Sequence, residues 1–273
     1  QVMLDLEDAV AVEAKVGARA TVVKALLDKQ WPDKIVSVRV NAATTNWFEE
    51  DVIEVVRGAG ARIDTIVLPK VESAQDVRLL AMLLTRTERR HGLARAIGIE
   101  PQIESAHGLR FVEEIAEADE RVESLTFGPA DYAASIGSPV LSIGTNELDY
   151  PGHVWHYPMS RIVVAAKSRG LAVIDGPYGV IDDTAGLLAS AKLARALGYD
   201  GKWAVHPSQI ETIVDVFSPT DAEIARAQSI VERYTNATIR ERLGAVAHDG
   251  ELLDAASLKL AESTLRKAHR RKH

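Results

Sequence analysis

Two acidic residues, Glu104 and Asp131, have the type and spacing of a metal site. Each follows a short run of strand-forming residues, Ala96–Ile103 and Val122–Phe127, and these runs are successive along the chain. Neighbouring parallel strands would bring the two carboxylates close together, and two carboxylates completed by water suit Mg²⁺. Either acid alone is more often a helix cap or a surface ion pair, so the prediction rests on the pair.

A second charged group surrounds Arg39, which follows the run Ile35–Val38. The guanidinium fork can hold a carboxylate or polarise a carbonyl oxygen. Asp5 and Glu7 share one face of an early strand because side chains alternate, and an acid among like charges can acquire the pKa of a general base. A salt bridge from Arg39 to these acids is the structural alternative, and both roles are compatible. We expect Glu7 to orient a base or a water, with Asp5 supporting it.

Lys70 and His206 also follow predicted strands. Lys70 could form a Schiff base in a metal-free aldolase, although pairing with acids or with a charged ligand is the favoured interpretation. His206 ends a strand just before Pro207, so we expect it to face the same site and to contact a ligand.

Seven short β-branched runs, each followed by a longer helical pattern, would position these residues. The runs are Val2–Leu6, Ile35–Val40, Thr65–Leu68, Ala96–Ile103, Val122–Phe127, Leu171–Ile174 and Lys202–Val205. Strands alternating with helices imply parallel strands and right-handed crossovers, which form either an open doubly wound sheet or a closed eight-stranded barrel.

The polar residues at the strand ends favour the barrel. In a (β/α) barrel the carboxyl ends of the strands converge on one mouth, where the active site lies. A dinucleotide-binding sheet would have a glycine-rich turn after its first strand, and Asp5–Lys15 contains no glycine. We therefore predict an α/β fold, a (β/α)8 TIM barrel whose first βα unit is absent from this sequence.

The pattern changes beyond Pro207. Residues 220–243 and 255–269 read as amphipathic helices joined by a polar loop over 247–253. The sequence thus predicts a catalytic barrel over residues 1–217 and a C-terminal helical extension or lid over 218–273.

Composition narrows the possible partners. The 273 residues carry a net charge of −7, which argues against nucleic acid as a partner. No apolar stretch reaches the roughly 18 residues that span a bilayer, so no membrane partner is expected. The chain has no cysteine, which excludes disulfides, thiolate zinc sites and a cysteine nucleophile. Cytoplasm is the expected compartment.

Seven segments together resemble the signature blocks of the HpcH/HpaI aldolase/citrate lyase β-subunit-like family. In order they are Leu4–Val10, Ser37–Asn41, Leu68–Glu72, Ile103–Gly108, Phe127–Ser135, Asp175–Gly179 and Gly201–Pro207. The blocks cover nearly the whole chain, and the segments 154–157 and 175–179 are most similar to the malyl-CoA/β-methylmalyl-CoA lyase branch.

The resemblance implies a barrel with a mobile lid, assembled as a homotrimer or homohexamer, with Glu104 and Asp131 as Mg²⁺ ligands. It implies that Asp254 reaches a neighbouring subunit's site and has a catalytic role there. It also implies a set of substrate-binding residues, with Arg39 at the oxo acid or acyl carbonyl and Ala130 and the Val205–His206 turn at the CoA ester: Arg39, Ala130, Asp131, Val205 and His206.

Together with these residues, the resemblance implies a Mg²⁺-dependent lyase that reversibly cleaves a malyl-CoA-type thioester into an acyl-CoA and a 2-oxo acid such as glyoxylate. Four alternatives remain open at this point. They are a citrate lyase β-subunit-like protein that acts with an acyl-carrier partner, a thioesterase that uses Asp254, a class II aldolase acting on free aldehydes, and a non-catalytic barrel.

Overall fold

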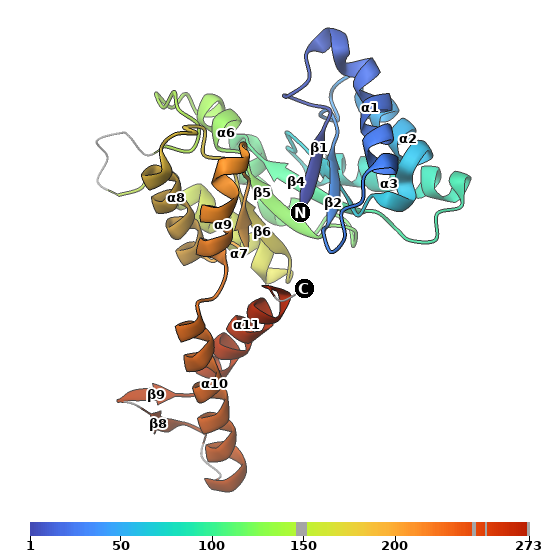
Figure 1. The fold of residues 1–273 in the computed structure, drawn as a ribbon. Coiled ribbons are helices and arrows are strands. Elements are labelled where there is room, and N and C mark those ends of the chain that lie inside the picture. The colour runs from blue at the N-terminus through green and yellow to red at the C-terminus, as the bar shows by residue number, and fades with distance from the viewer. Residues whose placement is uncertain (146–151, 242–243, 249, 272–273) are drawn as a thin grey trace. The chain divides into compact units, whose positions relative to one another are not determined.

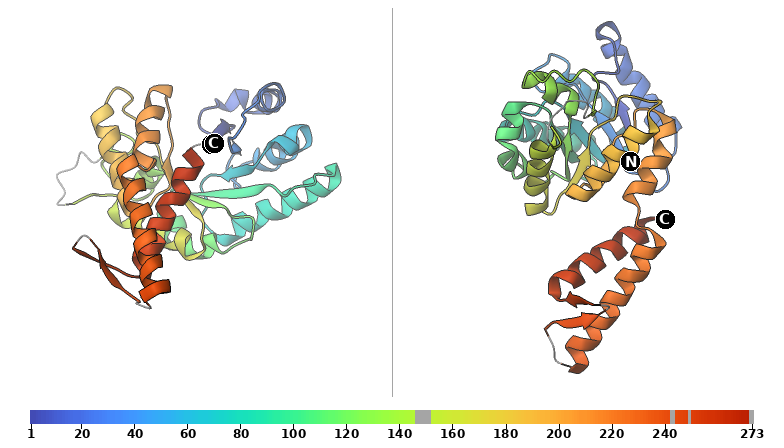
Figure 2. Two further views of the ribbon diagram at one scale, coloured as in Figure 1. Left: turned by 60° about the horizontal axis from the view of Figure 1, so that its bottom comes forward. Right: turned by 90° about the vertical axis from the view of Figure 1, so that its left-hand side faces the viewer.

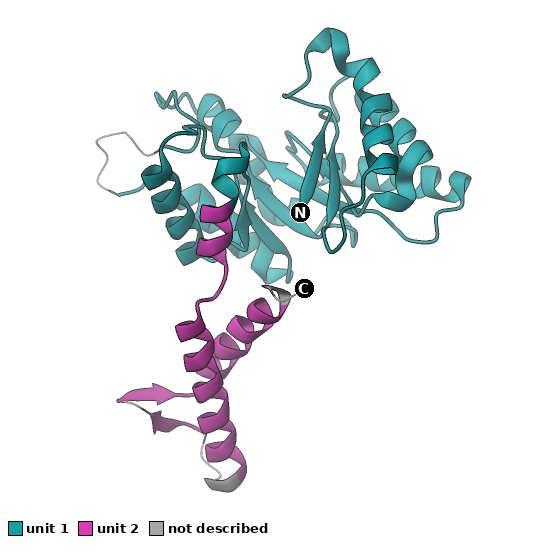
Figure 3. Ribbon diagram, viewed as in Figure 1, with its two compact units in different colours: residues 1–210 teal, residues 211–273 magenta. Residues whose placement is uncertain are grey.

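The structure, a computed structural model, describes residues 1–145, 152–241, 244–248 and 250–271. These residues form two compact units, residues 1–210 and 211–273 (Figure 3). Each unit has its own secondary structure and is described separately.

Seven parallel strands form the sheet of the first unit. They are β1 (Val2–Asp5), β2 (Val36–Arg39), β3 (Thr65–Leu68), β4 (Gly98–Ile103), β5 (Ser124–Phe127), β6 (Ala172–Asp175) and β7 (Gly201–Lys202). Their spatial order is the same as their order along the chain, and every neighbouring pair is parallel. This is the strand order of a barrel wall, and the sheet curls accordingly (Figure 1). The predicted α/β fold of the barrel type is confirmed.

Helices follow the strands and cover the outer side of the curled sheet (Figure 1, Figure 2). Their amphipathic faces explain this position, because α2 buries Val52, Val55 and Val56 while Glu49, Glu50 and Arg57 are exposed. The helices of this unit are α1 (Lys15–Asp28), α2 (Phe48–Ala59), α3 (Ala74–His91), α4 (Ala106–Arg110), α5 (Val112–Ala116), α6 (Pro129–Ser135), α7 (His156–Ser168) and α8 (Thr184–Leu197), with 3₁₀ turns at Val12–Ala14, Gly60–Arg62 and Pro207–Gln209.

Strand β4 separates an apolar outer face from a polar inner face. Ile99 and Ile103 are fully buried, whereas Glu100, Gln102 and Glu104 alternate with them and point to the other side of the sheet. Glu100 accepts hydrogen bonds there from Thr65 Oγ1 (2.5 Å) and from Ser37 on β2. The inside of the curled sheet is therefore lined with polar side chains below the carboxyl ends of the strands.

The second unit contains the rest of α9 (Ile210–Phe217), followed by α10 (Asp221–Asn236), a π-helical turn (Ala237–Glu241), β8 (Val246–His248), β9 (Glu251–Leu253) and α11 (Ala255–Arg271). A capping box, in which Thr220 and Glu223 bond to each other's backbone N–H groups, begins α10. Among the described residues of the chain, no helix is long and apolar enough to cross a membrane.

The loop predicted over 247–253 is wrong. Strands β8 and β9 pair antiparallel there, with Val246 opposite Leu253. Both of these side chains are buried, and together with Ala237 they form the unit's apolar cluster. Gly250, at φ +79°, supplies a left-handed backbone between the strands. The polar composition of this segment did not indicate a hairpin, because only Val246 and Leu253 at its two ends face the apolar cluster.

Candidate active site

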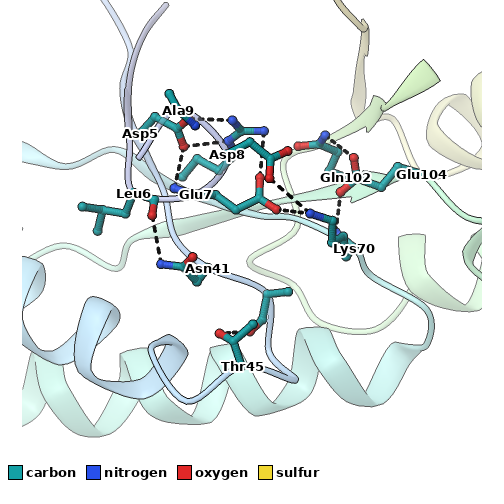
Figure 4. A network of polar contacts seen from close by, with 12 residues as sticks. Asp5, Leu6, Glu7, Asp8, Ala9, Asn41, Thr45, Lys70, Gln102 and Glu104 are labelled. Atoms are coloured by element: carbon teal, nitrogen blue, oxygen red, sulfur yellow. Dashed lines mark hydrogen bonds and ion pairs between the residues drawn. The ribbon is translucent and has the colours of Figure 1, made fainter. Parts of the chain in front are cut away.

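Charged side chains converge at the carboxyl ends of β1 to β4, where the sequence predicts the mouth of the barrel (Figure 4). Glu7 and Asp8 follow β1, Lys70 follows β3 and Glu104 follows β4. In Figure 4, Lys70 lies between Glu7 and Glu104 and is bonded to both. The tertiary structure thus brings together residues that are about 30 positions or more apart in the chain, as parallel βα units do.

Arg39 is paired with the acids that follow β1. Its Nε and NH2 donate to the two oxygens of Asp5 at 2.8 and 2.6 Å, and its NH1 lies 3.0 Å from Glu7 Oε2. The ring of Trp203 lies under the guanidinium, 5.4 Å from its carbon. Burial opposes the charged form of Arg39, but hydrogen bonding to Asp5 raises the pKa of Arg39 above its usual value. The salt bridge that the sequence offers as an alternative role for Arg39 is present.

Asp5 and Glu7 differ although they share one cation. Burial works against the charge of Asp5, but the hydrogen bonds from Arg39 lower the pKa of Asp5. Burial raises the pKa of Glu7 despite its contacts with Lys70 and Arg39. Asp5 is therefore a fixed anionic partner of Arg39, whereas Glu7 is the acid of this pair that more readily exchanges a proton.

Glu104 is buried and held at both of its oxygens. Lys70 N donates to Oε1 at 2.6 Å, and Gln102 Nε2 donates to Oε2 at 2.5 Å. Burial, followed by the negative charge of Asp131, raises the pKa of Glu104 to about 8. Gly128 leaves room for this carboxylate, because a Cβ on Gly128 would lie 2.5 Å from the Cβ of Glu104.

Asp131 lies in the first turn of α6, directly after β5. Its charge acts on both Glu104 and Lys70. Across the described ranges, no group of three or more His, Cys, Asp and Glu side chains could hold a metal ion. A two-carboxylate site of Glu104 and Asp131 still fits Mg²⁺, which commonly takes one or two protein carboxylates and fills its octahedron with water and substrate oxygens. Burial is the main cause of the raised pKa of Glu104, and the charge of Asp131 adds to it.

Lys70 does not have the environment of an imine-forming lysine. Its Nζ lies 2.5 Å from Glu7 Oε1 and 3.4 Å from Asp8 Oδ1. Burial would lower the pKa of Lys70, but the hydrogen bond to Glu7 raises it above its usual value. A Schiff-base lysine needs a lowered pKa, so the acid-pairing interpretation of Lys70 agrees better with the structure.

The predicted CoA-side residues lie at the ends of β5 and β7. Ala130, Val205 and His206 are exposed there. His206 caps the turn at Pro207–Gln209, since its Nδ1 accepts a hydrogen bond from Ser208 N. In the neutral ring this leaves the proton on Nε2, which can donate to a ligand.

Asp254 belongs to the second unit, where it caps α11. Its Oδ1 accepts hydrogen bonds from Ala256 N and Ser257 N, both at 2.9 Å, and from Ser257 Oγ. These bonds with Ser257 lower the pKa of Asp254. The side chain is exposed, and its predicted role in a neighbouring subunit remains a prediction.

The roles of three site residues were not anticipated from the sequence, although two of the three lie in the segments that resemble the family. Gln102 holds Glu104, Trp203 lies on Arg39, and Gly128 makes space for Glu104. The period-two spacing of Glu100, Gln102 and Glu104 could have indicated Gln102, because alternate residues of a strand share one face. Trp203 lies in the block Gly201–Pro207, but no local pattern indicates its contact with Arg39, which lies on a distant strand.

The chain is similar to a known family of enzymes. Residues 1–207 match the family model described as HpcH/HpaI aldolase/citrate lyase. The chain is 39% identical to the L-malyl-CoA/β-methylmalyl-CoA lyase of Cereibacter sphaeroides, over 98% of this chain and 86% of that protein. It is 33% identical to the citrate lyase subunit beta of Escherichia coli, over 97% of this chain and 84% of that subunit.

Solved structures with the same fold include CitE of Mycobacterium tuberculosis in complex with magnesium, acetoacetate and coenzyme A. It has a TM-score of 0.76 and 29% identity, covering 98% of this chain and 89% of that one. A citrate lyase from Burkholderia xenovorans gives a TM-score of 0.87 at 25% identity, covering all of this chain and 84% of that one.

Proposed function

The chain belongs to the HpcH/HpaI aldolase/citrate lyase family, and from this premise we propose that it is a Mg²⁺-dependent carbon–carbon lyase acting on malyl-CoA-type thioesters. The relatives at 38–39% identity over almost the full chain are named L-malyl-CoA/β-methylmalyl-CoA lyases. The observation that carries the proposal is the buried carboxylate of Glu104 at the end of β4, which Lys70 N and Gln102 Nε2 hold in place and which lies in the field of Asp131. A buried acid near a second, half-buried acid at the carboxyl ends of neighbouring strands favours a divalent cation.

Glu104 and Asp131 would hold the ion, with water and substrate oxygens as its other ligands. When bound, Mg²⁺ would supply Lewis-acid polarisation of the oxygen that gains negative charge. Lys70 N and Gln102 Nε2 keep the Glu104 carboxylate fixed from opposite oxygens. Such support matters because mutating a residue that hydrogen-bonds to a metal ligand commonly lowers metal affinity 10- to 100-fold.

Arg39 would bind the 2-oxo acid end of the substrate. Its Nε and NH2 are engaged by Asp5, and its NH1 faces Glu7. The guanidinium is therefore fixed before substrate arrives, which lowers the cost of binding a carboxylate or carbonyl oxygen. Ala130, Val205 and His206 are exposed at the ends of β5 and β7, where they are available to the CoA ester.

For cleavage, a base removes the proton of the substrate hydroxyl, and that oxygen becomes the carbonyl of the 2-oxo acid. The C–C bond breaks, and its electron pair moves to the carbon beside the thioester carbonyl, which then takes up a proton to give the acyl-CoA. Glu7 orients the base or a water, since it is the acid of the Arg39 group with a raised pKa. The condensation direction uses the same groups in reverse.

The decisive experiment is incubation of the purified protein with Mg²⁺, acetyl-CoA or propionyl-CoA, and glyoxylate or pyruvate. Intact CoA esters are followed by mass spectrometry, with EDTA as the control. We expect a malyl-type adduct that EDTA abolishes. The same adduct formed at an equal rate in EDTA would contradict the Mg²⁺ role, and no adduct from any combination would contradict the lyase.

A carrier-dependent role is the second candidate, because the chain is 33% identical to a citrate lyase subunit beta. Such a subunit would act on a thioester attached to a carrier protein. Turnover of free CoA esters by the isolated protein excludes dependence on a carrier. Activity that appears only with an acylated carrier favours it.

A further inference from the structure

Lys70 has an unusual backbone conformation at the centre of the charged cluster. Its φ is +53°, and among the described residues other than glycine only Asp33, at +61°, is also positive. A lysine in the left-handed region is strained, whereas glycine occupies it at no steric cost. Non-glycine residues in such conformations persist where the surrounding structure requires them, and they cluster at functional sites.

The conformation lets Lys70 contact two acids with two different groups. Its backbone N–H points to Glu104 and donates to Oε1 at 2.6 Å. Its side chain extends to the other side, where Nζ lies 2.5 Å from Glu7 Oε1 (Figure 4). One residue therefore connects the carboxylate that follows β4 with the carboxylate that follows β1.

The segment after Lys70 is fixed from both sides. Val71 N donates to Gln102 O at 3.3 Å, which ties it to β4. A Cβ on Gly108 would collide with Val71 O, so α4 packs closely against the following peptide. These contacts hold the backbone in place, and a residue that disfavours positive φ would have to turn the Lys70 N–H away from Glu104.

We infer that Lys70 is a positioning residue with two separable roles, its left-handed backbone orienting the metal ligand Glu104 and its ammonium group orienting Glu7. A glycine would serve the first role with less strain, and the second role explains why a lysine occupies the position. The inference rests on the proposed Mg²⁺ role of Glu104, but its test distinguishes failure of the Lys70 roles from failure of the Mg²⁺ role.

The test of the backbone role compares Lys70→Gly with Lys70→Val. Both variants lack the ammonium group, so the loss of charge cancels in the comparison, and the difference reports how readily the backbone adopts positive φ. We expect Lys70→Gly to bind Mg²⁺ at least as tightly as the unchanged protein, because a positive charge near the acids has been removed. Lys70→Val should bind Mg²⁺ about tenfold more weakly than Lys70→Gly. Isothermal titration calorimetry measures both affinities without substrate.

Lys70→Ala is a second variant in case Lys70→Val does not fold. Its Mg²⁺ affinity should fall between those of Lys70→Gly and Lys70→Val. Asp33→Gly and Asp33→Val form the matched control at the other positive-φ position, which lies between α1 and β2. That pair should differ in melting temperature and not in Mg²⁺ affinity.

Equal affinities of Lys70→Gly and Lys70→Val would overturn the backbone role while the Mg²⁺ site itself stands. No Mg²⁺ binding by the unchanged protein would overturn both.

The side-chain role is tested with Lys70→Met and Lys70→Arg. Methionine removes the charge at similar length, so kcat should fall about 10- to 100-fold while Mg²⁺ affinity is retained. Arginine keeps the positive charge next to Glu7 and should recover a large part of kcat. Equal kcat of Lys70→Met and the unchanged protein would overturn this role, and so would a Lys70→Arg variant as slow as Lys70→Met.

Discussion

The Arg39 group and the Glu104 group lie at the carboxyl ends of strands in one sheet, but their charges are balanced in opposite ways. Arg39 is surrounded by Asp5 and Glu7, and every charge has a counter-charge within hydrogen-bond distance. Glu104 is fixed by two neutral donors and lies in the field of another acid, Asp131. The first group is complete within the protein, and the second favours an added cation.

This difference indicates that the two groups have different roles. A paired arginine is rigid and always charged, so it is suited to recognising a substrate anion by shape. A buried carboxylate with a raised pKa carries a free-energy cost that a divalent ion would remove on binding. In the Arg39 group, burial favours a fixed arrangement of paired charges. At Glu104, burial would favour binding of a divalent cation.

The largest effect is expected from Glu104→Gln. This change removes a proposed metal ligand, so kcat/KM should fall on the order of 10³-fold or more and Mg²⁺ binding should be lost. Because a buried like charge is also removed, the metal-free variant should melt roughly 2–4 °C higher than the unchanged protein above pH 8. Differential scanning calorimetry with EDTA tests the second point. A lower melting temperature would contradict the uncompensated charge.

Arg39→Gln should have the opposite effect on stability. It leaves the buried Glu7 and the half-buried Asp5 without their shared cation, and breaking a buried ion pair costs about 3–5 kcal/mol. We expect kcat/KM to fall about 10²-fold, mainly through KM for the oxo acid, while Mg²⁺ affinity changes little. Steady-state kinetics and denaturant unfolding measure the two effects. A variant as stable as the unchanged protein would show that the Arg39 pairs contribute nothing.

Glu7→Gln probes the acid that contacts both Arg39 and Lys70. Turnover should fall about 10- to 100-fold because the orienting carboxylate is lost. Mg²⁺ affinity should stay within a few-fold, since Glu7 is not one of the proposed ligands. Normal turnover by this variant would refute the role of Glu7.

The smallest effect is a dependence of Mg²⁺ affinity on pH. With a pKa of about 8, Glu104 holds a proton in the metal-free protein at neutral pH, and Mg²⁺ must displace it. Affinity should therefore rise by at most about tenfold per pH unit up to pH 8 and then level off. Calorimetric titrations at several pH values test this. Affinity independent of pH would place the pKa of Glu104 well below 7.

The same shift predicts how the metal-free protein responds to pH. An unfolded Glu104 releases its proton near pH 4.5, but the folded protein keeps it until about pH 8. The folded state therefore binds more protons in this interval, and the contribution of Glu104 to stability decreases as pH rises from 4.5 to 8. Saturating Mg²⁺ should reduce this dependence, because it holds the carboxylate ionised.

Much of the fold and part of the site could be predicted from local patterns. Short β-branched runs such as Thr65–Leu68 predict strands, and the longer stretches with helical periodicity after them predict helices. These patterns depend on residues that are close together in the sequence. Glu104 and Asp131 follow two such runs, so their location at the carboxyl edge of the sheet follows from chain order alone. The hairpin of β8 and β9 escaped prediction because its few apolar residues form no visible alternation.

The sequence by itself determined which elements form, their order, and which charged residues end the strands, because these properties depend on neighbours along the chain. Only the tertiary structure decided which of those charges are paired. Asp5 meets Arg39 and Lys70 meets Glu104 across 34 residues of sequence each. Burial and partner geometry set the pKa values of Glu7 and Glu104 and the left-handed backbone of Lys70. These properties arise from distant strands brought to one edge of the sheet, and no local pattern encodes them.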